Sequence, residues 1–451
     1  MSHHPMQLAC PDLFRQQALI GGRWVDDAAA GSFDVRDPAS GSVLGTVPSL
    51  SADDVARAID TAVTAQRDWA GRPATERAAL LMRWHDLMLE HREDLALLMT
   101  REQGKPLTEA QGEVAYAASF IKWFAEECRR VYGCTIPAAA ADRRLITIQQ
   151  PIGVTAAITP WNFPAAMLTR KAGPALASGC AMIAKPAEDT PFTALALGFL
   201  AREAGLPDGL LNVITGDPVT VTKPLMDSNA VRKISFTGST EVGRLLMRQA
   251  SDTVKKLSLE LGGNAPFIVF DDADIDAAVD GAMASKYRNT GQTCVCANRI
   301  FVQDAVYDAF VEKLAAATAR LKVGAGTEDD VSQGPLINVQ AMEKVTAHVA
   351  DALEKGGRIV IGGKPHARGG TFFEPTVIAD ASRDMRLFGE ETFGPVAPVF
   401  RFHEDDEVVA LANDTPFGLA SYFYARDIGR VIRIAESLES GIVGVNSGLI
   451  S

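Results

Sequence analysis

Between residues 154 and 261, short apolar runs alternate with stretches of helical periodicity. Strands that are joined through helices lie parallel in a wound sheet, because a parallel crossover needs about the length of a helix. The alternation therefore predicts a parallel α/β sheet, and the runs from Phe267–Phe270 to Gly441–Asn446 predict a second α/β set. The strand-like runs of the first set are Val154–Thr159, Cys180–Ala184, Leu211–Ile214, Lys233–Thr237 and Leu257–Leu261.

The residues that precede this series have helical periodicity. Ser51 can cap a helix, and the segments Leu80–Leu98 and Ala115–Cys128 repeat the helical pattern. The pattern then changes to the alternation of a strand, over Leu145–Gln150. The apolar face expected of the first helix consists of Val55, Ile59, Ala62 and Val63.

The length of 451 residues exceeds the roughly 250–300 at which one hydrophobic core stops growing, so two or more domains are expected. Asp and Glu outnumber Lys and Arg by 56 to 44, which gives a net charge of -12. This balance argues against nucleic acid as the main partner and against broad docking on an anionic membrane. An anionic substrate would need a local cationic site.

Six cysteines are too few for a disulfide scaffold, and neither a Cys-x-x-Cys pair nor a histidine cluster predicts a metal site. The N-terminal sequence lacks the basic stretch and apolar run of a signal peptide. The longest uncharged stretch, Leu145–Thr169, contains three prolines, so a membrane helix is not expected there. These features predict a cytoplasmic protein.

A dinucleotide site is indicated at the carboxyl ends of the strands, although the sequence after the first strand is not the Rossmann fingerprint G-x-G-x-x-G. Lys185 and Glu188 follow the second strand, where a carboxylate can bind ribose hydroxyls and repel a 2′-phosphate, favouring NAD over NADP. Phe236-Thr-Gly-Ser239 ends the fourth strand and opens a helix, whose N–H groups and Ser239 hydroxyl could receive a phosphate. Taken singly, Gly238 could only form a turn, and Lys185 and Glu188 could be a solvated ion pair. Both features follow the carboxyl ends of predicted strands, where wound sheets bind ligands, and this shared position favours a role in binding.

The segment Asn289–Cys296 is the most informative one for chemistry. A thiol with a pKa near 8.5 is only slightly ionised at neutral pH, so a nucleophilic cysteine needs a polar, donor-rich setting. Gly291 permits a tight backbone approach, and the N–H of Cys294 could stabilise an oxyanion. A buried structural pair of cysteines is the alternative, and spacing alone does not choose between Cys294 and Cys296. No histidine sits in a comparable motif, which weakens a Cys–His protease hypothesis.

With these motifs in place, the chain resembles the aldehyde dehydrogenase superfamily from about Leu19 to its last residue. The resemblance implies a Rossmann-like wound sheet for the cofactor, a second α/β catalytic domain and a small oligomerisation hairpin. It implies a cofactor-binding domain in residues 1–132 and 151–260, the hairpin in 133–150 and the catalytic domain in 261–451. The strings that stand in the family's order and spacing are Pro160-Trp-Asn-Phe-Pro164, Phe236-Thr-Gly-Ser239, Leu259-Glu-Leu-Gly-Gly-Asn264, Gly291-Gln-Thr-Cys294 and Glu391-Thr-Phe-Gly-Pro395.

The resemblance also implies catalytic roles. Cys294 would attack the aldehyde and form a thiohemiacetal, while the Asn162 amide and the Cys294 N–H hold the oxyanion. Hydride transfer would leave a thioester, and Glu260 would activate water to hydrolyse it; without the family, Glu260 reads as a surface carboxylate. The cofactor would be NAD, with NADP as the alternative. Its expected contacts are Thr159, Pro160, Trp161, Lys185, Glu188, Gly216, Phe236, Gly238, Ser239, Glu391 (on the nicotinamide ribose) and Phe393 (beside the ring).

Within the superfamily, the chain is most similar to the succinate-semialdehyde dehydrogenases. The resemblance makes Arg170 and Arg288 carboxylate anchors, with Ser451 as a third contact; a bidentate guanidinium suits this task. The alternative for each arginine is a domain-interface ion pair. Glutarate semialdehyde stays open as substrate, because one methylene changes binding by only about 1–3 kcal/mol. Cys296 would form a reversible disulfide with Cys294, or be an inert core residue.

Two further functions stay open. Relatives continue beyond the position of Ser451 with a strand that joins another subunit, so a homodimer or homotetramer is expected if that segment is present. A chain that ended there could be a catalytically silent, truncated subunit, with an unpaired edge on the hairpin. A cysteine acyltransferase or esterase is the other alternative, although it would have no use for Lys185, Glu188 or Glu391.

Overall fold

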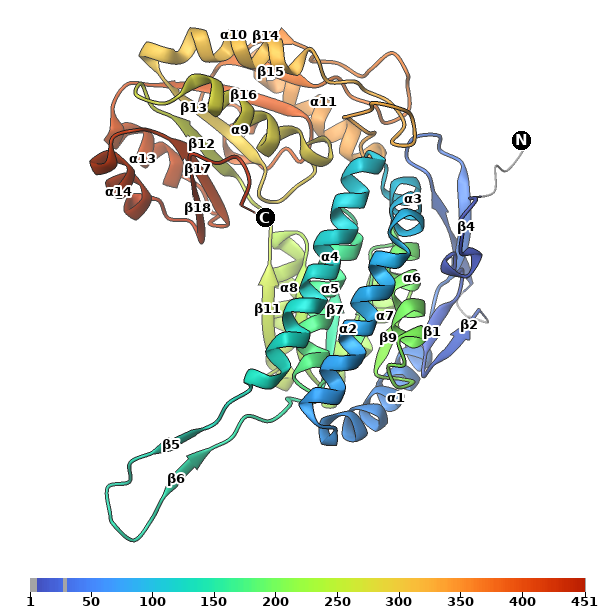
Figure 1. Ribbon diagram of the computed structural model, residues 1–451. Coiled ribbons are helices and arrows are strands. Elements are labelled where there is room, and N and C mark those ends of the chain that lie inside the picture. The colour runs from blue at the N-terminus through green and yellow to red at the C-terminus, as the bar shows by residue number, and fades with distance from the viewer. Residues whose placement is uncertain (1–5, 27–30, 451) are drawn as a thin grey trace. The chain divides into compact units, whose positions relative to one another are not determined.

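The computed structural model describes residues 6–26 and 31–450, and the chain divides into two compact units (Figure 1). The first consists of Met1–Asp37, Ser42–Gln103 and Ala110–Glu260. The second consists of Leu261–Ser451 together with two short segments from the N-terminal part of the chain, Pro38–Gly41 and Gly104–Glu109.

The sheet of the first unit has the strand order β11-β10-β7-β8-β9-β1-β2. The five central and edge strands from β7 to β11 are parallel, as the alternating pattern predicted. The order runs outward in both directions from β7, so β8 lies on one side of it and β10 on the other. Ligands of wound sheets bind at such a switch point, beyond the carboxyl ends of the strands. The strands are β7 (Val154–Ile158), β8 (Ala181–Lys185), β9 (Leu211–Val213), β10 (Val231–Thr237) and β11 (Lys256–Glu260).

Two antiparallel strands, β1 (Ala18–Ile20) and β2 (Arg23–Val25), extend this sheet at the β9 edge. The sequence prediction missed them, because three residues are too few to show an alternation. A separate antiparallel pair, β3 (Ser32–Arg36) and β4 (Val43–Pro48), follows them. Because of β1 and β2, the seven-stranded sheet of the first unit is mixed, with parallel strands at its centre.

The predicted helix after Ser51 is α1, and Ser51 and Asp54 form a reciprocal capping box at its start. The segment predicted as one helix over Leu80–Leu98 contains two, which are separated at His91. The helices of this unit are α1 (Ala52–Gly71), α2 (Ala74–Glu90), α3 (Arg92–Gln103), α4 (Leu107–Glu127, whose first residues belong to the second unit), α5 (Pro164–Ala177), α6 (Pro191–Glu203), α7 (Pro218–Asp227) and α8 (Thr240–Ala250).

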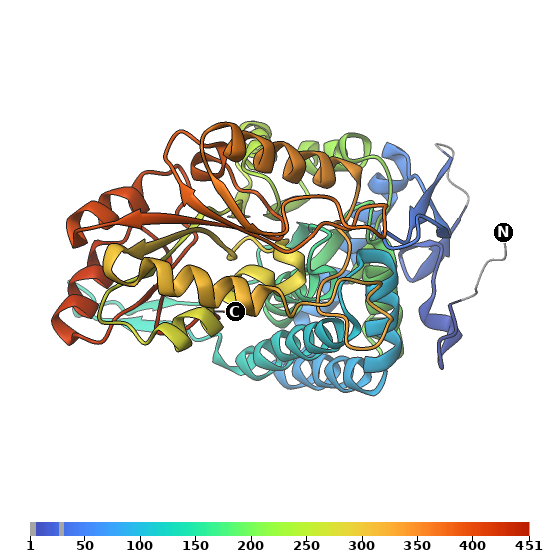
Figure 2. The same ribbon diagram turned by 90° about the horizontal axis from the view of Figure 1, so that it is seen from above.

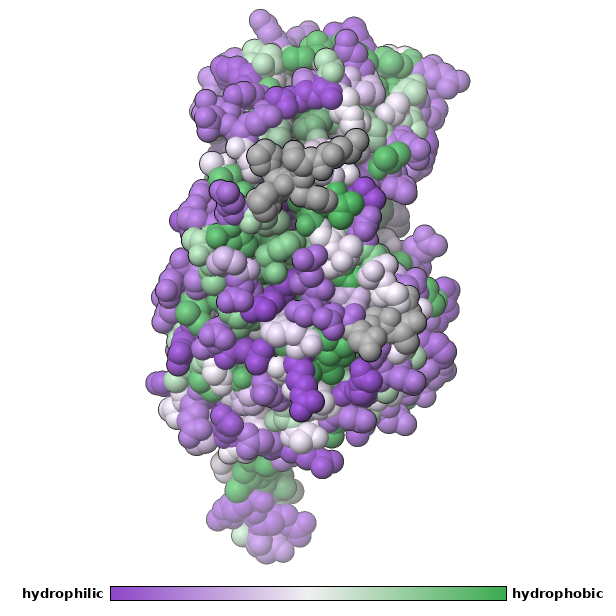
Figure 3. Space-filling view, turned by 90° about the vertical axis from the view of Figure 1, so that its right-hand side faces the viewer, coloured by the Kyte–Doolittle hydropathy of each residue, from purple (hydrophilic) through white to green (hydrophobic). Residues whose placement is uncertain are grey.

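A two-stranded hairpin, β5 (Cys134–Ile136) and β6 (Leu145–Thr147), projects from the end of α4 (Figure 1). The strand predicted over Leu145–Gln150 is thus present but shorter. Large apolar side chains are exposed along it: Ile146 is 71% exposed and Ile148 70% exposed. Figure 3 shows this as a green band above a hydrophilic tip.

The second unit has its own sheet, in the order β14-β15-β16-β13-β12-β17-β18, in which β14 alone among these strands is antiparallel to its neighbour. The prediction of a second α/β set is confirmed. Its strands are β12 (Ala265–Val269), β13 (Ala297–Gln303), β14 (Arg358–Ile361), β15 (Thr376–Ala381), β16 (Val396–Phe402), β17 (Ala420–Tyr424) and β18 (Ile442–Val445).

Helices cover both faces of this sheet (Figure 2). Successive residues of a strand point to opposite faces, so Phe267 packs toward α9 and α10 while Ile268 packs toward α13 and α14. Each fully buried side chain of this kind contributes roughly 1.5–3 kcal/mol. The helices are α9 (Ile275–Tyr287), α10 (Tyr307–Thr318), α11 (Val339–Glu354), α12 (Arg386–Gly389), α13 (Asp405–Asn413) and α14 (Ile428–Ser437). The short 3-10 turns of the chain are Pro11–Leu13, Cys128–Arg130, Ser251–Thr253, Arg288–Gly291 and Asp304–Val306.

Among the helices of residues 6–26 and 31–450, none combines the length and the apolar character needed to cross a membrane. Within the same residues, no cluster of His, Cys, Asp and Glu side chains could hold a metal ion.

Candidate active site

The carboxyl ends of the parallel strands of the first unit meet at one edge of its sheet. The N–H of Thr159, after β7, donates to the carbonyl of Lys185 at the end of β8 (3.1 Å). The N–H of Gly238, after β10, donates to the carbonyl of Glu260 at the end of β11 (3.1 Å). These hydrogen bonds continue the ladder into the loops, so the predicted cofactor residues after these strands share one edge.

The turn between β10 and α8 has the predicted form. Ser239 is the N-cap of α8, and its hydroxyl accepts a hydrogen bond from the N–H of Val242 (3.3 Å). A Cβ on Gly238 would lie 2.5 Å from the ring of Phe236, so this position needs glycine. Helix α8 therefore starts directly at the edge of the sheet, and the glycine before its N-cap, Gly238, has no side chain to occupy the space in front of the helix.

The other helices that start at this edge are capped by carboxylates. Glu113 receives the first N–H groups of α5, Glu102 those of α6, and Asp217 those of α7. A carboxyl side chain that already accepts hydrogen bonds from the first N–H groups of a helix leaves those groups unavailable to a phosphate. Among these four helices in the described chain, α8 is the one capped by a neutral hydroxyl, although the exposed Glu241 lies in its first turn. The residues present therefore fit a dinucleotide whose phosphates lie at α8.

Lys185 and Glu188 form an ion pair. The side chain of Lys185 is only 4% exposed, whereas that of Glu188 is 40% exposed. Lys185 is therefore not part of a solvated pair, because burial and pairing hold its ammonium at the end of β8. Gly216 follows β9 with a φ of +140°, and a Cβ there would lie 2.9 Å from the backbone nitrogen of Leu50. Packing thus already requires glycine at this position.

The loop from Thr159 to Phe163 joins β7 to α5 and carries the predicted oxyanion residue. Asn162 is buried, with 4% exposure, whereas Pro160 and Trp161 are half-buried. Pro160 precedes it, and Pro164 at the first position of α5 follows it. Both prolines fix their own φ, so the backbone around Asn162 has little freedom.

A cavity of about 350 Å³ in the first unit is lined by both Arg170 and Glu260, two of the predicted site residues. Glu260 is exposed at the end of the edge strand β11. Arg170, on α5, donates from Nη2 to the hydroxyl of Tyr116 (2.8 Å). Phe236 and Lys171 also line this cavity, and the Nζ of Lys171 donates to the Thr237 hydroxyl (2.5 Å).

In the second unit, the predicted cysteine loop has a strained backbone. Asn289, Thr290 and Gly291 all have positive φ values, 51°, 57° and 73°. A left-handed threonine is uncommon and is maintained only by its surroundings. The N–H of Asn289 donates to Glu109 (2.8 Å), and a Cβ on Gly291 would lie 2.2 Å from the carbonyl oxygen of Gly394.

The two cysteines of this loop differ in their surroundings. Cys296 is 6% exposed, and its thiol donates to the carbonyls of Lys286 (3.6 Å) and Ala297 (3.5 Å). Burial raises the pKa of the Cys296 thiol, against the lowering effect of Lys286. Cys294 is half-buried, and a Cβ on Gly263 would lie 2.1 Å from its carbonyl oxygen. The more accessible Cys294 is therefore the better candidate nucleophile, a choice that spacing alone did not allow.

Glu391 and Phe393 lie on the loop before β16. Burial raises the pKa of the Glu391 carboxyl to about 7, although the carboxylate accepts a hydrogen bond from the N–H of Gly263 (3.0 Å). Phe393 has a φ of 55°, which is strained for an aromatic residue. Between them, the N–H of Thr392 donates to the side-chain oxygen of Asn298 (3.2 Å). The hydroxyl of Thr392 forms a hydrogen bond with Nδ1 of His348 (3.2 Å).

Arg288, the other predicted carboxylate anchor, opens the cysteine loop and lines a small hollow with Thr293, Tyr422 and Leu449. Ser451, the third predicted contact, lies outside the described residues.

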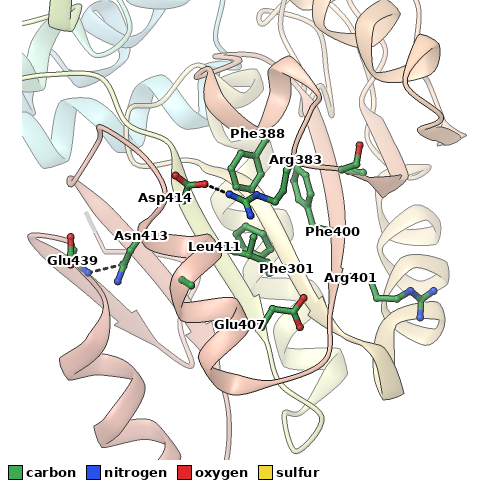
Figure 4. A pocket seen from close by; sticks show the side chains of 13 residues that line it. Phe301, Arg383, Phe388, Phe400, Arg401, Glu407, Leu411, Asn413, Asp414 and Glu439 are labelled. Atoms are coloured by element: carbon green, nitrogen blue, oxygen red, sulfur yellow. Dashed lines mark hydrogen bonds and ion pairs between the residues drawn. The ribbon is translucent and has the colours of Figure 1, made fainter.

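A larger cavity of about 760 Å³ lies elsewhere in the second unit, behind Phe388 (Figure 4). The guanidinium of Arg383 packs against the ring of Phe388 and forms an ion pair with Asp414 (2.5 Å). None of the predicted site residues lines it. Its size therefore does not mark the site of the chemistry.

The family model described as the aldehyde dehydrogenase family matches residues 24–451. The chain belongs to the aldehyde dehydrogenase family. It is therefore an oxidoreductase, and the resemblance drawn from the motifs is confirmed.

Relatives of known name extend this result. The chain is 60% identical over 446 residues to a succinate-semialdehyde dehydrogenase [NADP(+)] of Escherichia coli (strain K12), covering 99% of this chain and 92% of that protein. It is equally 60% identical, with the same coverage, to a glutarate-semialdehyde dehydrogenase of Pseudomonas aeruginosa. The crystal structure of a succinate-semialdehyde dehydrogenase from Burkholderia pseudomallei matches with a TM-score of 0.98 at 60% identity, covering 99% of this chain and 92% of that one. The predicted fold of this family is thereby confirmed.

Sequence reasoning missed the residues that support the site. Tyr116 and Glu113 contact α5, and both lie on α4, far from it in sequence. The only signal in the sequence is that they share one helical face, three residues apart. That spacing identifies a packed face, but it does not show which arginine or helix end the face meets.

Proposed function

We propose that this protein oxidises succinate semialdehyde to succinate, with NAD as the hydride acceptor and NADP as the alternative acceptor. The observation that carries the proposal is the 350 Å³ cavity lined by a half-buried arginine, Arg170, together with a carboxylate, Glu260. Among the described residues, Arg170 forms no ion pair, so its charge is available to a substrate carboxylate. The names of the 60% identical relatives support a semialdehyde as substrate.

In the proposed reaction, the Cys294 thiolate attacks the aldehyde carbon, and the new C–S bond converts the carbonyl oxygen into an oxyanion. The side-chain amide of Asn162 and the N–H of Cys294 donate to that oxyanion, a contribution typically worth about 3–4 kcal/mol per donor. Oxidation at this point would be supplied by a bound dinucleotide, which would take up the hydride from the thiohemiacetal carbon, and Cys294 would then carry the acyl group as a thioester. Glu260 then takes a proton from water, the hydroxide oxygen attacks the thioester, and the C–S bond breaks to release the acid and the Cys294 thiolate.

Each unit by itself contains residues that are proposed to hold the dinucleotide. At the edge of the first sheet, Glu188 would accept from the adenosine ribose and the start of α8 would donate to a phosphate. The other contacts proposed there are Thr159, Pro160, Trp161, Lys185, Gly216, Phe236, Gly238 and Ser239. In the second unit, Glu391 would accept from the nicotinamide ribose and Phe393 would pack beside the ring.

Glutarate semialdehyde is the second candidate substrate, because a relative of equal identity is named for it. It differs by one methylene, which shifts binding by about 1–3 kcal/mol. Arg170 and Arg288, with Ser451, are proposed to anchor the carboxylate in either case. The length of the pocket, rather than its charge, would then decide between the two.

The exposed apolar side chains of the β5–β6 hairpin support a homo-oligomer, a dimer or a tetramer, in which this surface is covered by another subunit. No disulfide joins any of the six cysteines, all of which lie in the described ranges. This supports the cytoplasm as the compartment, since thiols persist in reducing surroundings.

The test is the rate of NAD reduction with three aldehydes in reducing buffer: succinate semialdehyde, glutarate semialdehyde and butanal, which has four carbons but no carboxylate. We expect a clear preference for the carboxylated pair and no activity in Cys294→Ala. Activity on butanal alone would contradict the arginine anchors. Ester hydrolysis without dinucleotide turnover would favour the acyltransferase alternative, and dinucleotide binding without any turnover would favour a silent subunit.

A further inference from the structure

Two aromatic side chains of α4 hold the guanidinium of Arg170. Its Nη2 donates to the hydroxyl of Tyr116 (2.8 Å), and its Cζ lies 5.9 Å from the centroid of the Tyr116 ring and 4.9 Å from that of Phe120. Tyr116 and Phe120 are four residues apart on α4, so they share one face of the helix. Their rings meet edge to face, with centroids 4.7 Å apart. We call this pair the aromatic cradle.

The helices that carry the cradle and the arginine are packed closely. A Cβ on Gly173 of α5 would lie 3.0 Å from the ring of Phe124 and 3.3 Å from the carbonyl oxygen of Phe120. Glycine at this position therefore lets α5 approach the backbone of α4. This approach brings Arg170, one turn earlier on α5, within reach of the Tyr116 hydroxyl.

The cradle orients the guanidinium without neutralising it. A phenol oxygen and two ring faces are uncharged, and no carboxylate in the described part of the chain pairs with Arg170. Arg170 also donates a weak hydrogen bond from Nη1 to the sulfur of Met167 (3.8 Å). A guanidinium has five N–H donors, so enough remain for a bidentate carboxylate.

We propose that Tyr116 is a positioning residue that sets the preference of this enzyme for aldehydes with a distal carboxylate, by fixing the guanidinium of Arg170. The inference rests on the proposed role of Arg170 as an anchor. A free arginine side chain is flexible, so a substrate that binds it must also order it. An arginine that is already held by Tyr116 and Phe120 binds the carboxylate without that loss.

The test compares kcat/KM for succinate semialdehyde and for butanal in Tyr116→Phe, which removes only the hydroxyl. We expect kcat/KM for succinate semialdehyde to fall about tenfold, mainly through KM, since a hydrogen bond to a charged group is lost. We expect kcat/KM for butanal to stay within about twofold, because butanal has no group for Arg170 to bind. Equal losses on both substrates would indicate a general structural role and overturn the inference, as would no loss on either.

Two further variants separate this inference from the function it rests on. Arg170→Met should abolish the preference for succinate semialdehyde, and adding Tyr116→Phe to it should have no further effect. If Arg170→Met kept the preference, the anchor and the cradle would both be wrong. If Arg170→Met lost it while Tyr116→Phe kept it, only the cradle would be wrong.

Tyr132→Phe is the matched control, because Tyr132 is exposed on the chain after α4 and lies outside the proposed machinery. It should leave both substrates unchanged. Phe120→Leu, which keeps an apolar side chain but removes the ring, should shift the ratio of the two kcat/KM values in the same direction as Tyr116→Phe. A shift in the opposite direction would contradict the cradle.

Discussion

The carboxylate of Glu113 accepts a hydrogen bond of 2.9 Å from the backbone N–H of Ala165, at the second position of α5. It also accepts from the third position, Ala166 (3.2 Å). These are the N–H groups that an N-cap side chain usually binds, and Phe163, the N-cap of α5, offers none. A glutamate from α4 thus supplies the missing cap.

Glu102 has the same relationship to α6. Its carboxylate accepts from the N–H of Phe192 and of Thr193, both at 2.8 Å, and these too are the second and third positions of a helix that begins with proline. The two glutamates therefore carry out the same structural task on neighbouring helices. They differ in what precedes the helix, because only α5 follows the loop that holds Asn162.

This pairing allows a controlled prediction. Glu113→Ala and Glu102→Ala should each lower the free energy of unfolding by about 1–3 kcal/mol, since buried N–H groups lose their acceptor. Only Glu113→Ala should also lower kcat, by at least tenfold per folded enzyme, because the Asn162 loop loses its support. Denaturation curves and kcat normalised to folded protein measure both, and Glu113→Gln, which keeps an acceptor, should restore most of kcat. Equal kcat losses in the two alanine variants would contradict it.

The pH dependence of stability gives a second prediction. Burial raises the pKa of the Glu102 carboxyl to about 8, against 4.5 for the ordinary group. The folded state therefore favours the protonated acid, and this contribution is full below pH 4.5 and is lost as the pH rises through 8. Between pH 5 and 9, the free energy of unfolding of the wild type should fall on the order of a few kcal/mol more than that of Glu102→Gln. Parallel curves for both proteins would contradict it.

The sequence predicted the two α/β sets, the strand positions of the first set, and the first and last strands of the second, because those depend on local periodicity. It missed β1 and β2, because strands of three residues are too short to show an alternation. It also missed the break between α2 and α3 at His91, because the residues on either side of His91 favour a helix. The support of Arg170 by Tyr116 could not be predicted, because it depends on how closely α4 and α5 approach. Spacing alone did not choose between Cys294 and Cys296; the family resemblance named Cys294, and its greater exposure supports that choice.

Glu391 should impose a pH dependence on cofactor binding. Its carboxyl has a pKa raised to about 7 by burial, and protonation replaces part of its capacity to accept hydrogen bonds with an O–H donor. The KM for NAD should therefore rise as the pH falls below 7, whereas the KM for succinate semialdehyde follows a different profile. In Glu391→Gln, the KM for NAD should be high and flat over pH 6–8, and a retained inflection would assign the titration to another group.

The pair of Lys185 and Glu188 should control cofactor choice. Glu188 repels a 2′-phosphate, while the buried ammonium of Lys185 can meet one if it is released from the pair. Glu188→Gln should therefore raise the ratio of kcat/KM for NADP to that for NAD, by about tenfold for the removal of one like charge. The ratio is measured with saturating succinate semialdehyde, and Glu203→Gln, on α6 and away from the pair, is the control. An unchanged ratio would place the ribose elsewhere.

Cys296 is the remaining hypothesis to test, as the partner of Cys294 in a reversible disulfide. A bridge across one intervening residue is strained, so thiols should reduce it easily. Cys296→Ser should keep most of the activity, because a serine hydroxyl can donate to the same backbone carbonyls as the thiol. Peroxide should inactivate the wild type in a way that dithiothreitol reverses, whereas in Cys296→Ser, Cys294 would oxidise further to an acid that thiols do not restore. Recovery of Cys296→Ser equal to that of the wild type would make Cys296 an inert core residue.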